Sequence, residues 1–176
     1  MITREQAFRM LEEHKVPQSI IEHSLAVNKI AMYLAKKLKE AGIEVDEKLV
    51  DVASLLHDID KIETRDDHVR HGEKSHEMLK NISPEVANVV RKHNLGNIIK
   101  GELKTWEEKI VFYADKRVNG TKIVTLEERY NYLKKRYGSI SKEAMDFIEK
   151  TAPLVKALEK EIFSKIKGNP EDILNL

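Results

Sequence analysis

Residues 49–61 of the chain, LVDVASLLHDIDK, join an apolar helical pattern directly to a cluster of ionisable residues. Apolar side chains stand at positions 49, 52, 53, 55 and 56, a spacing that places them on one face of an α-helix. Asp46 precedes the segment and can cap that helix. The pattern ends at His57 and Asp58, so a histidine and a carboxylate stand where a buried helix stops.

The same helical spacing extends over nearly all of the 176 residues. It predicts a long helix from Gln18 to Ala41 and a last one from Ser141 to about Ile166, which Pro153 is expected to kink or break. Residues 94–104 are expected to form an irregular connection, and residues 168–176 a short tail. Strand-type alternation does not persist over more than a few residues. The predicted fold class is therefore all-α, with about seven or eight helices.

The composition excludes several kinds of chemistry. The chain has no cysteine, which removes disulfides, thiolate nucleophiles, Cys-type zinc sites and iron–sulfur clusters. Its 31 basic and 30 acidic residues give a net charge of +1, which favours neither a general nucleic-acid role nor a membrane-surface role. The N-terminal residues contain no apolar signal region, so we expect a cytoplasmic protein. The chemistry that remains is that of His, Asp, Glu and Lys.

Four separate predicted helices each direct a histidine or an aspartate towards the core. His23 lies between Ile20 and Val27 on one apolar stripe, and His93 and Asp115 occupy inward positions on two later helices. A single inward histidine is usually a core residue bonded to a carbonyl, and a single buried aspartate can pair with an arginine. Four such helices together indicate a metal site built between helices. Imidazole with carboxylate suits Fe, Mn, Co, Ni or Zn better than Mg.

This order of residues resembles the HD-domain superfamily of metal-dependent phosphohydrolases, in which a first histidine, a His-Asp pair and a late aspartate bind one metal. Residues 55–61 are similar to the HDIG variant, with Asp60 in place of the usual glycine. Two-metal members add two histidines, one of them followed by glycine, and their HD aspartate bridges the ions. The resemblance implies one or two divalent ions held by His23, His57, Asp58, His71, His93 and Asp115. A mononuclear site without His71 and His93, and His68 in place of His71, are the alternatives.

The resemblance covers about Ile20 to Val118. We expect a single HD domain over residues 1–176, with a motif-bearing core at about 18–120 and C-terminal helices at about 121–167. The apolar stripe of the last helix completes either the monomer core or the face of a homodimer.

The resemblance implies hydrolysis of a phosphoester or phosphoanhydride by a metal-activated water. The substrate would be a nucleotide or another small phosphorylated molecule. The net charge predicts no membrane partner and argues against a nucleic-acid partner. Asp58 and Lys61 are the expected catalytic residues, and Lys61 and Arg117 are expected to contact the substrate. Two divalent ions beside two aspartates leave a charge of roughly +2, which matches a phosphate.

Two other functions are compatible with the same residues. One is an HD module that senses a nucleotide or a metal without turnover, and the other is an RNA 2′,3′-cyclic phosphodiesterase. The RNA hypothesis draws on the basic residues 134–136, which stand near Tyr132 and two further tyrosines. Tyr130 and Tyr137 are expected in the core beside Leu133, and the near-zero net charge argues against a large phosphate footprint.

Overall fold

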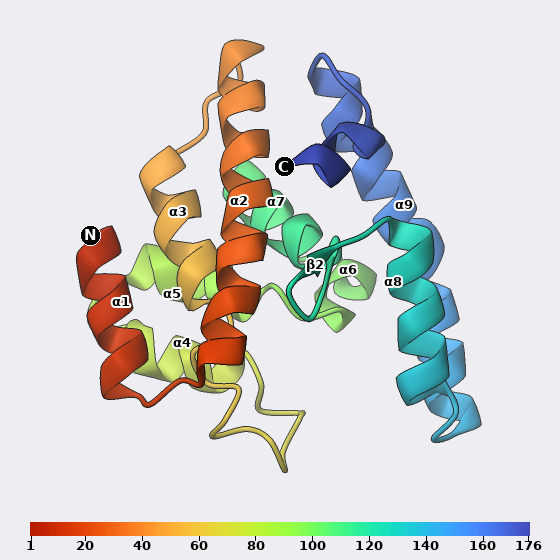
Figure 1. Cartoon of the computed structure of the whole chain (residues 1–176), viewed down its shortest axis with the longest axis horizontal. Helices are drawn as coiled ribbons and strands as arrows, with labels where there is room; N and C mark the ends of the chain where they lie inside the picture. The colour runs from red at the N-terminus through yellow and green to blue at the C-terminus, as the bar shows by residue number, and fades with distance from the viewer.

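The computed structural model describes the whole chain, residues 1–176, and is almost entirely helical (Figure 1). A short antiparallel hairpin pairs β1 (Val118–Asn119) with β2 (Lys122–Ile123), a π-helical turn η1 covers Lys134–Gly138, and a 3₁₀ helix η2 covers Pro170–Asn175. The all-α fold class is confirmed. The nine α-helices are α1 (Arg4–Glu13), α2 (Gln18–Glu40), α3 (Glu47–Leu56), α4 (Glu73–Leu79), α5 (Pro84–Arg91), α6 (Gly96–Lys100), α7 (Trp106–Asp115), α8 (Leu126–Leu133) and α9 (Lys142–Lys165).

Local signals in the sequence set several helix starts. Thr3, Thr105 and Thr125 each accept a hydrogen bond from the third residue of their helix, whose Gln or Glu side chain bonds back to the cap. Asp46 accepts the Leu49 amide at the start of α3. These caps fix where α3 and α7 begin. His57 and Asp58 directly follow the last residue of α3, and Asp115 is the last residue of α7.

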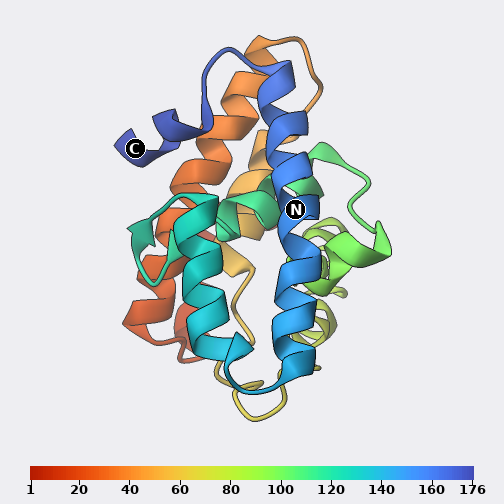
Figure 2. The same ribbon diagram turned by 90° about the vertical axis from the view of Figure 1, so that its right-hand side faces the viewer.

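Helix α2 runs through the middle of the molecule (Figure 1). Its inner stripe, which includes Ile30, Leu34 and Leu38, is completely buried. Helices α3 and α7 pack on it, and α5 packs against both of these. Helices α8 and α9 lie side by side along another side of the molecule (Figure 2), where α9 contacts α7. None of the helices combines the length and the apolar character needed to cross a bilayer.

The structure differs from the sequence predictions in the connections. Residues 96–100 form α6 where an irregular connection was expected. Helix α9 continues through Pro153 without the break that the sequence allowed. Pro153 is exposed, and so is Glu149, whose carbonyl loses its helical partner. The expected tail carries η2, whose Ile173 is fully buried in the core.

Arg117 joins these C-terminal elements instead of contacting a substrate. Its guanidinium donates to the Val124 carbonyl at 2.6 Å, the Tyr113 hydroxyl at 2.7 Å and the Pro170 carbonyl at 3.0 Å. The Glu159 carboxylate lies 3.6 Å away and compensates the charge. With only 1% of its surface exposed, Arg117 is a structural residue, and its expected role in substrate binding is not supported.

Replacing Arg117 by methionine should therefore lower stability and leave divalent-metal binding intact. Breaking a buried charge pair costs about 3 kcal/mol or more, because the remaining charge is left unpaired. Chemical denaturation followed by circular dichroism measures this loss. Arg9→Met, on the exposed face of α1, is the matched control and should stay within about 0.5 kcal/mol of the wild type. Equal stability of the two variants would contradict the structural assignment.

Candidate metal centre

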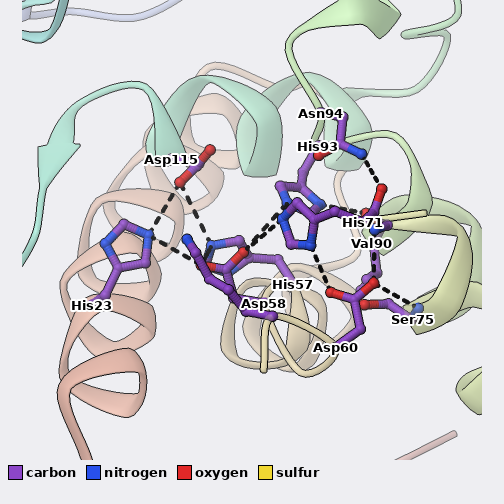
Figure 3. A network of polar contacts seen from close by, with 12 residues as sticks. His23, His57, Asp58, Asp60, His71, Ser75, Val90, His93, Asn94 and Asp115 are labelled. Carbon is purple, nitrogen blue, oxygen red and sulfur yellow. Dashed lines mark hydrogen bonds and ion pairs between the residues drawn. The ribbon is translucent and has the colours of Figure 1, made fainter. Parts of the chain in front are cut away.

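Four histidines and two aspartates from different parts of the chain meet at one place (Figure 3). They come from the second turn of α2, the residues just after α3 and α5, the segment before α4, and the last residue of α7. The structure thus brings together all six residues predicted as ligands: His23, His57, Asp58, His71, His93 and Asp115.

Each of the four histidines is held through its Nδ1 atom. His57 Nδ1 lies 2.7 Å from the Ser54 carbonyl oxygen, and His93 Nδ1 lies 2.6 Å from that of Val90. These carbonyls belong to the last turns of α3 and α5, where backbone acceptors have no partner within the helix. His23 Nδ1 lies 2.6 Å from the Gly120 carbonyl oxygen, in the turn of the hairpin.

A carbonyl oxygen can only accept a hydrogen bond, so these contacts fix the tautomer of each ring. The proton sits on Nδ1, and Nε2 keeps its lone pair for the centre. His23 Nε2 lies 3.1 Å from Asp115 Oδ1, and His57 Nε2 lies 3.6 Å from the same oxygen. These three residues form the first group of atoms that could hold a metal ion.

Asp58 lies between this group and a second one. Its Oδ1 atom lies 3.1 Å from His71 Nε2 and 3.5 Å from His93 Nε2, which completes the second group. Its Oδ2 atom lies 3.7 Å from His23 Nε2 and 3.6 Å from His57 Nε2. One carboxylate therefore presents one oxygen to each set of imidazoles (Figure 3), the arrangement needed to bridge two ions.

The chemistry of these atoms fits divalent cations. His57 Nε2 is buried and has no hydrogen-bond partner, which is costly for a polar atom in a protein core. His71 Nε2 and His93 Nε2 lie 3.1 Å apart, so two lone pairs face each other unless a cation or a proton stands between them. Within each group the ligand atoms lie within 4.8 Å of one another. Imidazole and carboxylate are ligands for transition-metal ions.

Burial and neighbouring charges shift the pKa values of the ligands in different directions. Burial alone would lower the pKa of His71, but hydrogen bonds to Asp58 and Asp60 raise it to about 9. Burial, and the neighbouring His71 and His57, lower the pKa of His93 to about 4. Burial opposes ionisation of Asp58, yet His57, His71 and His93 hold its pKa well below the usual value. Both oxygens of Asp58 are thus available as charged ligands.

Asp60, which replaces the glycine of the HDIG pattern, supports the second group from outside. It is fully buried, and its Oδ1 atom accepts a hydrogen bond from His71 Nδ1 at 2.7 Å. Its Oδ2 atom accepts the backbone amides of Gly72 at 2.7 Å and Ser75 at 3.0 Å. Asp60 therefore orients His71 and also satisfies the start of α4, where free amides favour negative charge.

The glycine after His71 is required by the same local geometry. Gly72 has a φ of +86°, and a Cβ atom there would lie 2.7 Å from Asn94 Nδ2. The Asn94 amide also donates to the His71 carbonyl, which fixes this backbone from the other side. His68, the alternative ligand, is exposed and belongs to neither group.

Two lysines lie against the ligand carboxylates. Lys61 Nζ donates to Asp58 Oδ2 at 2.7 Å, from a half-exposed side chain that lines the cavity over the centre. Lys116 directly follows Asp115, and the sequence favours a solvated surface charge over a phosphate contact for it, but the structure buries it. Its buried Nζ atom donates to Asp115 Oδ2 and, at 2.9 Å, to the His93 carbonyl. Lys116 thus ties the two groups together.

In a comparison with known protein families, residues 20–120 match the HD domain. This range contains all six ligands and Lys61. The chain belongs to the HD-domain family. This membership confirms the resemblance at the level of the superfamily, which consists of metal-dependent phosphohydrolases.

Two relatives show how far the similarity extends. An uncharacterized protein of Methanocaldococcus jannaschii is 33% identical over 135 residues, which are 69% of this chain and 79% of that protein. A tRNA (cytidine(56)-2′-O)-methyltransferase of Picrophilus torridus is 30% identical over 138 residues. This match covers 70% of the present chain but only 38% of the methyltransferase. No solved structure matches the chain significantly.

Removing the Asp60 carboxylate should weaken metal binding by the second group alone. In Asp60→Ala the His71 ring loses its Nδ1 partner, and loss of such an outer partner lowers metal affinity about 10- to 100-fold. Calorimetric titration of metal-free protein with Mn²⁺ measures both binding steps. Asp66→Ala, an exposed aspartate of the same segment, is the control and should bind like the wild type. Wild-type affinities in Asp60→Ala would refute this role of Asp60.

Proposed function

We propose that the protein is a phosphohydrolase that uses two divalent metal ions to hydrolyse a nucleotide or another small phosphorylated molecule. The observation that carries this proposal is the pair of adjacent three-ligand groups, the second of which includes Asp58, whose other oxygen faces the first group. Family membership supports the reaction class. The groups open into a cavity of about 760 Å³, within the size range of small-molecule sites.

The six ligands would hold the ions, with His23, His57 and Asp115 on one side of Asp58 and His71 and His93 on the other. Bound divalent ions supply Lewis acidity towards a phosphoryl oxygen and lower the pKa of water. Lys61 contributes a cation at the cavity surface, where it can bind an oxygen of the phosphate. Lys116 and Asp60 hold Asp115 and His71 in position, because each bonds the side of its neighbour that faces away from the centre.

A second candidate function is hydrolysis of a phosphoester in RNA, such as a 2′,3′-cyclic phosphate. One observation favours it: one relative of the chain is a tRNA methyltransferase. The two functions use the same metals and differ in the size of the substrate. Activity on RNA that exceeds activity on every mononucleotide tested would favour the second.

Asp58→Ala should lose hydrolysis down to the uncatalysed rate, because it removes a ligand that faces both groups. Chromatographic separation of substrates and products from a panel of nucleotides and cyclic nucleotides, with Mn²⁺ supplied, measures the activity. Circular dichroism should show unchanged helix content, and metal binding should fall by at least one ion. Asp146→Ala, exposed on α9, serves as the matched control. Activity that survives in Asp58→Ala, or absence of turnover by the wild type over the whole panel, would overturn the proposal.

Lys61→Met should raise KM by about tenfold or more, since a hydrogen bond to a charged phosphate contributes about 1.5–3 kcal/mol. Steady-state kinetics on the best substrate of the panel measures this change, and elemental analysis should show an unchanged metal content. Lys29→Met on the exposed face of α2 is the control. A wild-type KM in Lys61→Met would exclude contact between Lys61 and the substrate.

A further inference from the structure

One part of the cavity is built by α8 and η1, which lie outside the region matched to the HD family. Arg129 and Tyr132 come from α8, and Arg136 and Tyr137 come from η1. We call these four residues the α8–η1 wall. Figure 1 shows α8 beside the rest of the bundle, with the hairpin next to it. The wall lines the same cavity as His23, Asp58 and Asp115, so a ligand in that cavity can meet both.

The arginines of the wall have no carboxylate partner. Arg129 Nη1 donates to Asn119 Oδ1 at 2.8 Å, but its Nε atom is buried without any hydrogen-bond partner. Arg136 forms no ion pair, and neither does Arg65, which lines the cavity from the segment after α3. Lys61 and Lys116, by contrast, are each paired with a ligand aspartate. Three guanidinium groups thus bring uncompensated positive charge to the cavity.

The tyrosines of the wall are exposed, whereas Leu126, Tyr130 and Leu133 on the apolar stripe of the same segment are buried. Tyr130 is buried and bonded to Thr151 at 2.9 Å, as its place on the apolar stripe predicts. Tyr137 was expected beside it in the core, but it is 42% exposed, and Tyr132 is 39% exposed. The π-helical turn η1 changes the helical phase after Leu133, which explains the difference. Both rings present flat apolar surface to the cavity.

An arginine guanidinium group lies over each of the two exposed tyrosine rings. The Arg129 guanidinium carbon lies 5.8 Å from the centre of the Tyr132 ring, and that of Arg136 lies 5.6 Å from the centre of the Tyr137 ring. Such pairs hold the arginines against the rings at little entropic cost. The wall thus contains two Arg–Tyr pairs. In each pair the tyrosine ring can stack on an aromatic ring of a ligand, and the guanidinium can donate two hydrogen bonds to a phosphate.

We propose that the α8–η1 wall binds the part of the substrate that is not at the metal centre, and that this substrate is a nucleoside carrying two or more phosphates. The proposal rests on the proposed function. The metal ions and Lys61 match the charge of the phosphate under attack, whereas the three arginines provide charge for further phosphate groups. The base stacks on Tyr132 or Tyr137, since stacking on an aromatic ring accepts any base.

The same features favour a small nucleotide over an RNA chain. The unpaired arginines all line one cavity of about 760 Å³ and do not form a stripe along the surface. Lys134 and Lys135, the other basic residues of η1, do not line it. A net charge of +1 provides little general attraction for a polyanion.

Binding of hydrolysis-resistant phosphonate analogues to the metal-loaded protein tests the wall. Isothermal calorimetry would compare analogues of a purine nucleoside monophosphate and diphosphate with methylenediphosphonate, which has no base. Arg136→Gln should weaken the diphosphate analogue about tenfold and the monophosphate analogue less than threefold, because it removes one charged contact to the second phosphate. Tyr132→Leu or Tyr137→Leu, whichever removes the ring under the base, should weaken both nucleoside analogues about tenfold and leave methylenediphosphonate unchanged.

Lys135→Gln is the matched control, because it removes the same charge from the adjacent exposed residue that does not line the cavity. It should bind all three compounds like the wild type. Equal affinities of Arg136→Gln and Lys135→Gln for the diphosphate analogue would overturn the proposal, as would binding of an RNA oligomer by the wild type without binding of either nucleoside analogue. Elemental analysis of the wild type separates the two hypotheses: a metal-loaded protein that fails these tests disproves the wall alone, whereas a protein that takes up no metal disproves the proposed function.

Discussion

The hydrogen bonds at the Nδ1 atoms of four histidines are the constraint on which the candidate centre depends. Three of these bonds go to backbone carbonyls and the fourth goes to Asp60. Because each partner can only accept, or strongly prefers to accept, every ring turns its Nε2 lone pair inward. Without these bonds the same residues would be four histidines of undefined tautomer around two carboxylates.

The all-α fold supplies these acceptors because helices end at the centre. His57 and His93 follow the last residues of α3 and α5 closely, and each bonds a carbonyl three residues earlier, in the last turn of its helix. Asp115 is the last residue of α7, and Lys116 after it bonds both Asp115 and the His93 carbonyl. The packing of α3 and α7 on α2 then brings these ends to His23. The contacts that pack α3 and α7 against α2 therefore also place the ligand residues beside one another.

Helical spacing allowed the fold class and the inward positions of His23, His93 and Asp115 to be predicted, and the apolar helix that ends at His57 and Asp58 indicated that pair. His71 was predicted only from the resemblance to the HD domain, because it lies outside any helical stripe. Features that depend on contacts between distant segments were not predictable in this way. The sequence left open whether Asp60 adds charge near the phosphate or bonds a ligand from outside, because the choice depends on its contacts with His71 and with the start of α4. Arg117 was misjudged because its partners lie on η2 and α9. Tyr137 was misplaced because the π-helical turn shifts the phase of the stripe. The cavity wall is therefore the part of the site about which the sequence said least.

The central claim is that the two groups of ligands hold one divalent ion each. Anomalous diffraction from crystals grown with Mn²⁺ tests it directly, since it locates each ion without assuming an activity. The account predicts two anomalous peaks per chain, one among His23, His57 and Asp115 and the other among Asp58, His71 and His93. A single anomalous peak per chain, or none, in crystals grown with excess Mn²⁺ would contradict this claim.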